Sequence, residues 1–133
     1  MTSKVAVPVV LEGWTPPFSP AVRWGDLLFV SGQTSLDVGT MTVVGDDVGE
    51  QARLALEALM EVLRAAGSGP EHVLRVECYL AAPDGFRAWN AAFVEHFPTS
   101  PPARTTLVTG FPVPGMLIEI QATAGIPDSA PSG

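Results

Sequence analysis

Only two segments of the chain have the apolar spacing of an amphipathic helix, and β-prone segments lie before, between and after them. In residues 47–66, apolar side chains recur at spacings of 3, 4 and 7. Asp46 or Asp47 can cap this helix, and Gly67 suits the left-handed position after its end. The second helix is predicted at residues 84–97. Two helices cannot cover both faces of a sheet, so this count restricts the possible folds strongly.

The second predicted helix carries mostly aromatic side chains on one stripe. Asp84 is expected to cap its N-terminus, and Pro98 ends it. Asn90 is a polar member of the stripe, and since a buried amide needs a partner, it either fixes the helix against the sheet or faces a ligand. The stripe consists of Phe86, Asn90, Phe93 and Phe97, with Trp89 beside it.

The β-prone segments predict a hairpin near the start of the chain and several later strands. Residues 21–24 and 27–31 are separated by Gly25-Asp26, and a two-residue Gly-x connection fits the primed turns of hairpins. Residues 41–44 are expected to add a third strand. Further strands are predicted at residues 73–80, 104–109 and 116–124, whereas Pro8 confines any strand in residues 5–11 to a sheet edge.

Two of these strands alternate between apolar and polar side chains, which assigns their faces. In residues 73–80 the apolar face is predicted to hold Leu74, Val76, Cys78 and Leu80, opposite Arg75, Glu77 and Tyr79. In the last strand it is predicted to hold Ile118, Ile120, Ala122 and Ala124, opposite Leu117, Glu119, Gln121 and Thr123. Cys78 is therefore interpreted as a small core residue rather than a nucleophile.

The predicted order of elements is β-β-α-β-α-β-β, which describes an α+β domain with one mixed sheet and both helices on one face. Each helix can serve as a right-handed crossover between parallel strands, and the terminal strand pairs are expected to form antiparallel hairpins. The uncovered face must meet water or another subunit, so we expect an oligomer.

Length and charge narrow the function classes. The 133 residues correspond to one domain, predicted at residues 1–124, followed by a disordered tail at residues 125–133. The 14 acidic and 7 basic residues give a net charge of −7, which disfavours nucleic acid as a partner. Without a membrane-length apolar run or signal-peptide pattern, no membrane association is expected and a cytoplasmic location is predicted. A single cysteine excludes an internal disulfide and a zinc site built on several thiolates.

Arg104 is the strongest candidate for binding a ligand. It opens a predicted strand directly after Pro101-Pro102-Ala103, where two prolines restrict the direction of the chain. A guanidinium fixed there can hold a carboxylate by a bidentate fork or form a structural salt bridge, and the residue pattern favours neither. Ser31 and Gln33, at the end of the predicted hairpin, can line a pocket or only form a turn.

Glu119 and Gln121 share the polar face of the last predicted strand. Two residues of strand rise separate them by about 7 Å, so a carboxylate at position 119 does not replace one at position 121 without a shift or an intervening water. The amide of Gln121 can hold a water molecule, but it does not accept a proton at neutral pH.

Four separated motifs occur in a characteristic order along the chain. They are Phe18-Ser19-Pro20-Ala21-Val22, Gly25-Asp26-Leu27-Leu28-Phe29-Val30-Ser31-Gly32-Gln33, Pro102-Ala103-Arg104-Thr105-Thr106 and Ile118-Glu119-Ile120-Gln121-Ala122. Together they resemble the Rid/YjgF family of imine deaminases over residues 14–124. The resemblance implies a chorismate-mutase-like fold and a homotrimer with a central barrel and ligand pockets between subunits.

The resemblance also implies an activity. Arg104 would hold the carboxylate of an imine or enamine derived from an amino acid, and hydrolysis would give a 2-oxo acid and ammonia with no metal or organic cofactor. The catalytic candidates are Arg104, Gln121 and Glu119, and the substrate-binding candidates are Phe18, Ser31, Gln33, Asn90, Arg104 and Thr106.

Three of these positions depart from the usual residues of the family. Gln121 stands where a second glutamate usually positions or activates the water. Phe18 replaces a tyrosine, and Thr106 replaces a cysteine. Two alternatives therefore stay open beside a general imine deaminase: a non-catalytic module that binds a small carboxylate or regulates a partner, and an enzyme for one imine-handling step of a specialised pathway.

Overall fold

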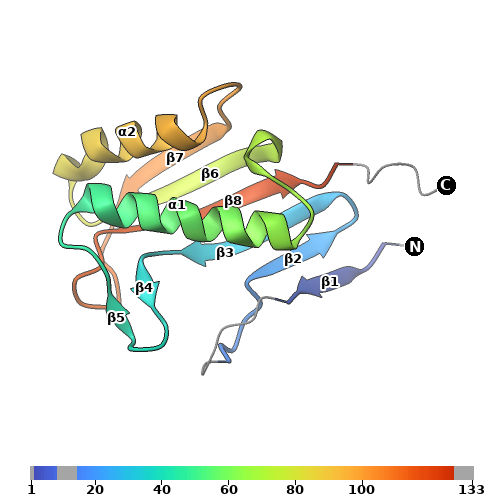
Figure 1. Ribbon diagram of the computed structural model, residues 1–133, viewed down its shortest axis with the longest axis horizontal. Helices are drawn as coiled ribbons and strands as arrows, with labels where there is room; N and C mark the ends of the chain where they lie inside the picture. Colours follow the sequence, from blue (N-terminus) through green and yellow to red (C-terminus); the bar gives the residue numbers. More distant parts are fainter. Residues whose placement is uncertain (1, 9–14, 128–133) are drawn as a thin grey trace.

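The computed structural model describes residues 2–8 and 15–127. Its main sheet has six strands in the order β1-β2-β3-β8-β6-β7, and a small separate sheet pairs β4 with β5 (Figure 1). The helices are α1 Val48–Ala65 and α2 Phe86–His96. The strands are β1 Lys4–Val7, β2 Ala21–Trp24, β3 Leu27–Gln33, β4 Leu36–Asp37, β5 Thr42–Val43, β6 Val73–Leu80, β7 Ala103–Val108 and β8 Ile118–Gly125. The predicted α+β architecture is confirmed.

Helix α1 forms where its apolar periodicity predicts it. The carboxylate of Asp47 accepts a hydrogen bond of 2.9 Å from the backbone N–H of Glu50, which caps the N-terminus. Gly67 follows the helix with φ of +80°, a conformation that glycine adopts at little cost. The buried residues of the helix, which pack on the sheet, are Gln51, Ala52, Ala55, Leu56, Leu59, Val62 and Leu63.

Strand β8 lies in the middle of the sheet. It pairs antiparallel with β3 on one side and with β6 on the other. The predicted hairpin of the last two strands is therefore wrong, because β7 pairs in parallel with β6 after the α2 crossover. A central position suits β8, whose inward side chains are all apolar and buried: Ile118, Ile120, Ala122 and Ala124.

Both helices cover one face of the sheet, as predicted (Figure 1). A register shift in β6 changes one of the predicted face assignments. Val73 pairs with Ala124, but Arg75 pairs with Thr123, so Leu74 lies at a bulge. Leu74 is consequently 52% exposed, and Val73 takes its place in the core beside Val76.

Other boundaries also differ from the prediction. Residues 41–44 do not extend the first hairpin, because β5 pairs only with β4. Asp84 does not cap α2, since a 3₁₀ turn at Pro83–Gly85 precedes the helix and Gly85 occupies the cap position without a side-chain hydrogen bond.

The domain continues past its predicted end at residue 124. Gly125 pairs with Leu27, and the N–H of Ile126 donates to the carbonyl of Asp26 at 2.8 Å. The disorder predicted for the end of the tail concerns residues 128–133, which lie outside the described residues. The segment 9–14, where part of the first strand was expected, is also outside them.

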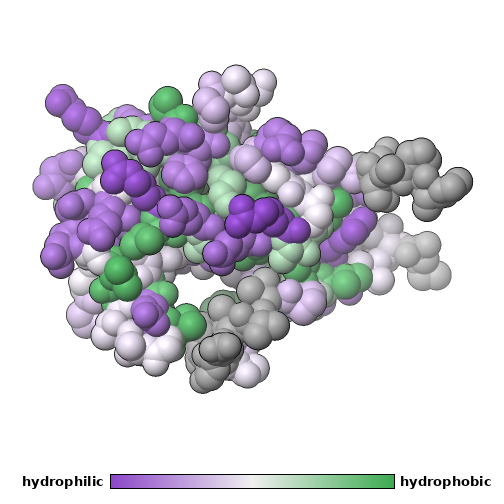
Figure 2. All heavy atoms as spheres, in the orientation of Figure 1, coloured by the Kyte–Doolittle hydropathy of each residue, from purple (hydrophilic) through white to green (hydrophobic). Residues whose placement is uncertain are grey.

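The face of the sheet opposite the helices carries large apolar side chains that are exposed in the single chain. Cross-strand partners share a face, so Trp24 and Leu27 lie together there, next to Phe29. Leu107 adds a fourth apolar side chain from β7. These residues are 41% to 54% exposed. The helix-covered side differs, because Figure 2 shows mainly hydrophilic side chains over α1. Among the described helices, none is long and apolar enough to cross a membrane.

Candidate functional site

Arg104 lies on the helix-covered face of the sheet, against α2. Its partner in the parallel β6/β7 pair is Val76, which is fully buried, so the register turns Arg104 inward. The guanidinium carbon lies 4.8 Å from the ring centre of Phe93, 5.6 Å from that of Phe86 and 5.7 Å from that of Trp89. These distances are within the range of cation–π attraction. Three aromatic rings of one helix thus hold a half-buried cation.

Trp89 connects this aromatic group to β7. Its side chain is fully buried, and its indole N–H donates a hydrogen bond of 3.3 Å to the hydroxyl oxygen of Thr106. Trp89 also packs edge-on against Phe93, with ring centres 5.4 Å apart. Thr106 and Arg104 are two residues apart on the same face of β7, so the indole is anchored beside the guanidinium.

The charge of Arg104 is not neutralised by the part of the chain that the structure describes. The ion pairs found there join other groups: Arg23 with Asp26, Arg53 with Glu95, and His72 with Glu71. The nearby thiol of Cys78 is uncharged at neutral pH, because burial raises its pKa to about 12 while the charge of Arg104 offsets part of this rise. The sequence left two interpretations of Arg104 open, a ligand-binding guanidinium or a structural salt bridge. Within the described residues the salt bridge is wrong.

Gln121 lies on the opposite, open face of the sheet. It faces Glu77 across the β8/β6 pair, and its amide donates a hydrogen bond of 2.6 Å to one carboxylate oxygen of Glu77. The hydroxyl of Tyr79 donates to the same oxygen at 3.2 Å. The pKa of Tyr79 is raised, first by burial and then by the hydrogen bond and charge of Glu77. Gln121 therefore serves to orient a carboxylate on β6.

Glu119 is the cross-strand partner of Tyr79 on the same open face. Its side chain lies against Gly32 so closely that a Cβ at position 32 would collide with the carboxylate and come within 2.8 Å of its Cδ. Burial raises the pKa of Glu119 above its ordinary value. Burial thus favours the neutral, protonated form of the Glu119 carboxyl group.

The end of β3 is tied to the loop before β2. The hydroxyl of Ser31 donates a hydrogen bond of 2.6 Å to the carbonyl of Ser19, next to Phe18. The amide of Gln33 donates to the carbonyl of Ser31 at 3.1 Å. Phe18 is 53% exposed. The motif around Ser31 therefore builds a fixed loop whose aromatic side chain faces outward.

A family model described as endoribonuclease L-PSP matches residues 14–126 of the chain. The chain belongs to this family, the Rid/YjgF family. A RutC family protein of Pyrococcus horikoshii is 35% identical to this Rid/YjgF member over 108 residues, which are 81% of the chain and 86% of that relative.

Solved Rid/YjgF structures have the same fold. A member of the YjgF family from Mycobacterium tuberculosis superposes with a TM-score of 0.79 at 27% identity, covering 93% of this chain and 100% of that one. A protein of unknown function from the Rid family of Yersinia pestis gives a TM-score of 0.84 at 24% identity, covering 93% and 100%. The latter likeness concerns the fold alone. The predicted family membership is confirmed.

Within one chain, five of the candidate residues of this Rid/YjgF protein fall into two groups. Arg104 and Thr106 lie on the helix-covered face, and Asn90 is half-buried on α2 next to Trp89. Glu119 and Gln121 lie on the open face. The fold does not bring the two groups together in a single copy, because the sheet separates them.

Sequence reasoning did not assign a role to Trp89, Phe86 or Phe93 beside Arg104, or to Glu77 and Tyr79 beside Gln121. Each of these contacts depends on the pairing register of β6, which joins residues 28 to 51 positions apart in sequence. The aromatic stripe of α2 was the available signal for the first group. The alternation of β6 placed Glu77 and Tyr79 on a polar face but did not give their partners.

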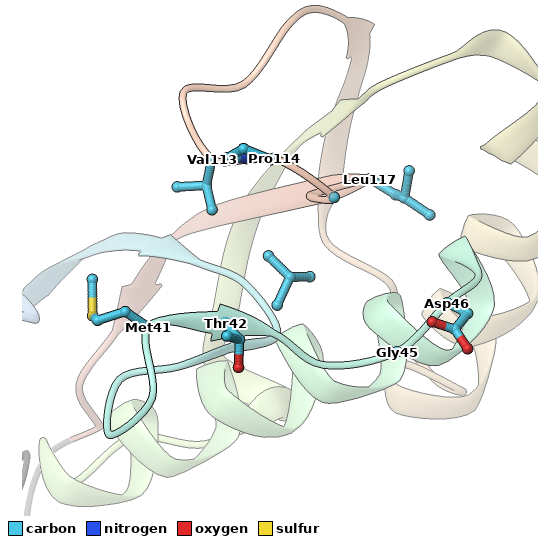
Figure 3. Close-up of a pocket in the computed structure, with 9 residues that line it drawn as sticks. Met41, Thr42, Gly45, Asp46, Val113, Pro114 and Leu117 are labelled. Atoms are coloured by element: carbon cyan, nitrogen blue, oxygen red, sulfur yellow. The ribbon is translucent and has the colours of Figure 1, made fainter.

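A pocket of about 570 Å³ lies between the β4/β5 hairpin and the loop before β8 (Figure 3). Met41 and Thr42 contribute from the hairpin, and Val113, Pro114 and Leu117 from the other side. The lining residues include Asp46 but no basic residue among the described ones, so the pocket is poorly suited to a carboxylate ligand. No described cluster of His, Cys, Asp or Glu has three members placed to hold a metal ion.

Proposed function

We propose that this Rid/YjgF protein hydrolyses reactive imines and enamines derived from amino acids, with Arg104 as the anchor for the substrate carboxylate. The observation that carries the proposal is the half-buried guanidinium of Arg104, held by three aromatic rings and without a carboxylate partner in the described chain. A cation kept in that state attracts an anionic ligand, and a guanidinium edge matches a carboxylate.

The reaction needs modest help from the protein. Water adds to the imine carbon, so that a C–O bond forms and the nitrogen gains a proton. The C–N bond of the resulting carbinolamine then breaks, the hydroxyl proton moves to the departing nitrogen, and a 2-oxo acid and ammonia result. Orientation of the substrate and a group that moves protons suffice for this chemistry, which uses no metal or organic cofactor.

We further propose that the site forms between copies in a homotrimer with a central barrel. The exposed apolar residues of the open face, Trp24, Leu27, Phe29 and Leu107, support an interface there. Such an assembly would let Arg104 of one copy meet the open face of another. Light scattering should then give three times the mass of one chain, and a single-chain mass would contradict this arrangement.

In this arrangement the polar cluster on the open face manages water and protons. Glu119 would exchange protons, and Gln121 would hold a water or orient Glu77. Phe18, Ser31, Gln33, Asn90 and Thr106 would line the substrate pocket. A dedicated step on one enamine or imine of a specialised pathway is compatible with the same chemistry.

A second candidate is a non-catalytic module that binds a small carboxylate or regulates a partner. The amide of Gln121 favours it, since an amide accepts no proton at neutral pH. Titration with a 2-oxo acid separates the candidates, because binding without turnover supports the module and absence of binding rejects it.

The family description as an endoribonuclease offers another activity, but the net charge of −7 does not suit a nucleic-acid partner. The absence of nucleic-acid and membrane partners and the cytoplasmic location stay predictions from the sequence.

The direct test follows 2-oxobutyrate formation while 2-iminobutyrate is generated in situ. The unaltered protein should exceed the rate in buffer, and Arg104→Ala should return the rate to that of buffer. Arg53→Ala, which removes an exposed arginine on α1, is the matched control and should keep full activity. A rate equal to buffer for the unaltered protein, or no effect of Arg104→Ala, would overturn the proposal.

A further inference from the structure

We infer that Trp89 is a positioning residue for Arg104, which acts through its ring on the guanidinium and through its N–H on Thr106. The inference rests on the proposed function, because it concerns how tightly the same site binds a carboxylate. Judged by burial alone, Trp89 would be only a core residue of the chain; the inference gives it a role in ligand binding as well.

The geometry ties two elements together at one point. The ring of Trp89 lies 5.7 Å from the guanidinium carbon of Arg104, and its N–H reaches the hydroxyl of Thr106 at 3.3 Å. Arg104 and Thr106 flank one residue on β7 and point to the same face. The indole therefore contacts both of the inward side chains that bracket the position where a carboxylate would bind.

A purely structural role does not explain the choice of tryptophan. A buried apolar site on α2 would be filled equally by an aromatic ring without a polar atom, whereas a buried indole N–H needs an acceptor. Here the acceptor is Thr106, on the strand that carries Arg104. The hydrogen bond fixes the ring in the orientation that faces the guanidinium.

The same contacts preserve the charge of Arg104. Aromatic faces attract a cation without neutralising it, so the guanidinium stays available for an anion. Its carbon lies 5.7 Å from the ring centre of Trp89 and 4.8 Å from that of Phe93, and these contacts occupy none of its N–H groups with a carboxylate. An arginine side chain that its neighbours already hold in place before the ligand arrives loses less conformational entropy when a carboxylate binds, which strengthens binding.

The test is calorimetric titration of 2-oxobutyrate into the full chain and its variants. Trp89→Phe keeps a ring but removes the N–H, and Thr106→Val removes the acceptor. Each should raise Kd about fivefold at unchanged stoichiometry, and the double variant should be no weaker than either single one, because one hydrogen bond is lost in all three. Thr106→Ser keeps a hydroxyl acceptor and should bind 2-oxobutyrate more tightly than Thr106→Val does.

Stoichiometry separates positioning from folding. A purely structural role would lower the number of binding-competent molecules and leave Kd unchanged, which would overturn the inference. A Kd within twofold of the unaltered protein in both Trp89→Phe and Thr106→Val would also overturn it, while loss of binding in Arg104→Ala would leave the proposed function intact. Absence of binding by the unaltered protein would instead contradict the proposed function itself.

Discussion

The side-chain amide of Gln121 donates a 2.6 Å hydrogen bond to the carboxylate of Glu77, its direct partner across β8 and β6. An amide and a carboxylate can pair in this way without sharing a proton, because the amide supplies the N–H and carries no charge. Two carboxylates at these positions would have to share a proton.

The first prediction is that Gln121→Glu makes stability depend on pH. Two carboxyl groups at this distance raise one pKa of the pair, so the native state binds more protons than the unfolded chain. The variant should match the unaltered protein below about pH 4 and lose about 1–3 kcal/mol as pH rises toward 7. Urea denaturation at a series of pH values measures this loss.

The swapped double variant Glu77→Gln/Gln121→Glu is the control for that experiment. It keeps one carboxylate and one amide across the same strand pair, so most of the stability lost near neutral pH should return. An equal loss in the single and double variants would show that crowding, rather than charge, destabilises position 121.

The second prediction concerns Glu119, whose pKa is raised by burial. A carboxyl with a raised folded-state pKa stabilises the fold most below its unfolded value, and that contribution is lost as pH rises through the folded value. Glu119→Gln should therefore gain stability relative to the unaltered protein from about pH 4 upward. If the two stability curves stay parallel between about pH 4 and pH 7, Glu119 titrates as an ordinary exposed carboxyl.

Gly32 offers an independent check on the environment of Glu119. Gly32→Ala would place a Cβ against the carboxylate and force that side chain outward. We expect greater exposure to return the pKa of Glu119 toward its ordinary value, measured by NMR titration of the side-chain carboxyl. An unchanged pKa would mean that the packing against Gly32 does not set it.

The third prediction is that Cys78 is inert in the folded protein. Its thiol is buried and its pKa is raised to about 12, so almost no thiolate exists at neutral pH. Iodoacetamide at about pH 8 should leave the native chain unmodified and label it fully in denaturant, as read by mass spectrometry. Rapid labelling of the native chain would show that Cys78 is accessible.

The fourth prediction concerns Gln51, a fully buried polar residue of α1. Its amide donates to the carbonyls of Gly45 and Gly115 at 3.0 and 2.9 Å, and its oxygen accepts from the N–H of Leu117 at 2.9 Å. Gln51→Leu would leave these backbone groups unpaired and should cost about 2–4 kcal/mol in urea denaturation. Glu57→Gln, on an exposed position of the same helix, should change stability by less than about 0.5 kcal/mol.

Local sequence signals predict the helices and the first hairpin because their causes are local. The cap at Asp47, the turn at Gly25-Asp26 and the left-handed Gly67 each depend on a few adjacent residues. The predicted alternation of β8 is also correct, since its four inward apolar residues are buried.

Long-range register is where the sequence is insufficient. The bulge at Leu74 moves the Leu74 side chain from the core to solvent, and the alternation of residues 73–80 does not predict this bulge. The insertion of β8 between β3 and β6 is likewise a pairing choice among distant strands. The same register places Arg104 against α2 and Gln121 beside Glu77. The sequence therefore predicts which residues belong to the candidate site but not which of them contact one another.

A crystal structure of this protein with bound 2-oxobutyrate tests the proposed site most directly. We expect the ligand carboxylate on the edge of the Arg104 guanidinium, with Glu119 and Gln121 of a second copy facing the ligand. A ligand bound elsewhere, or an Arg104 paired with a carboxylate of the protein itself, would contradict it.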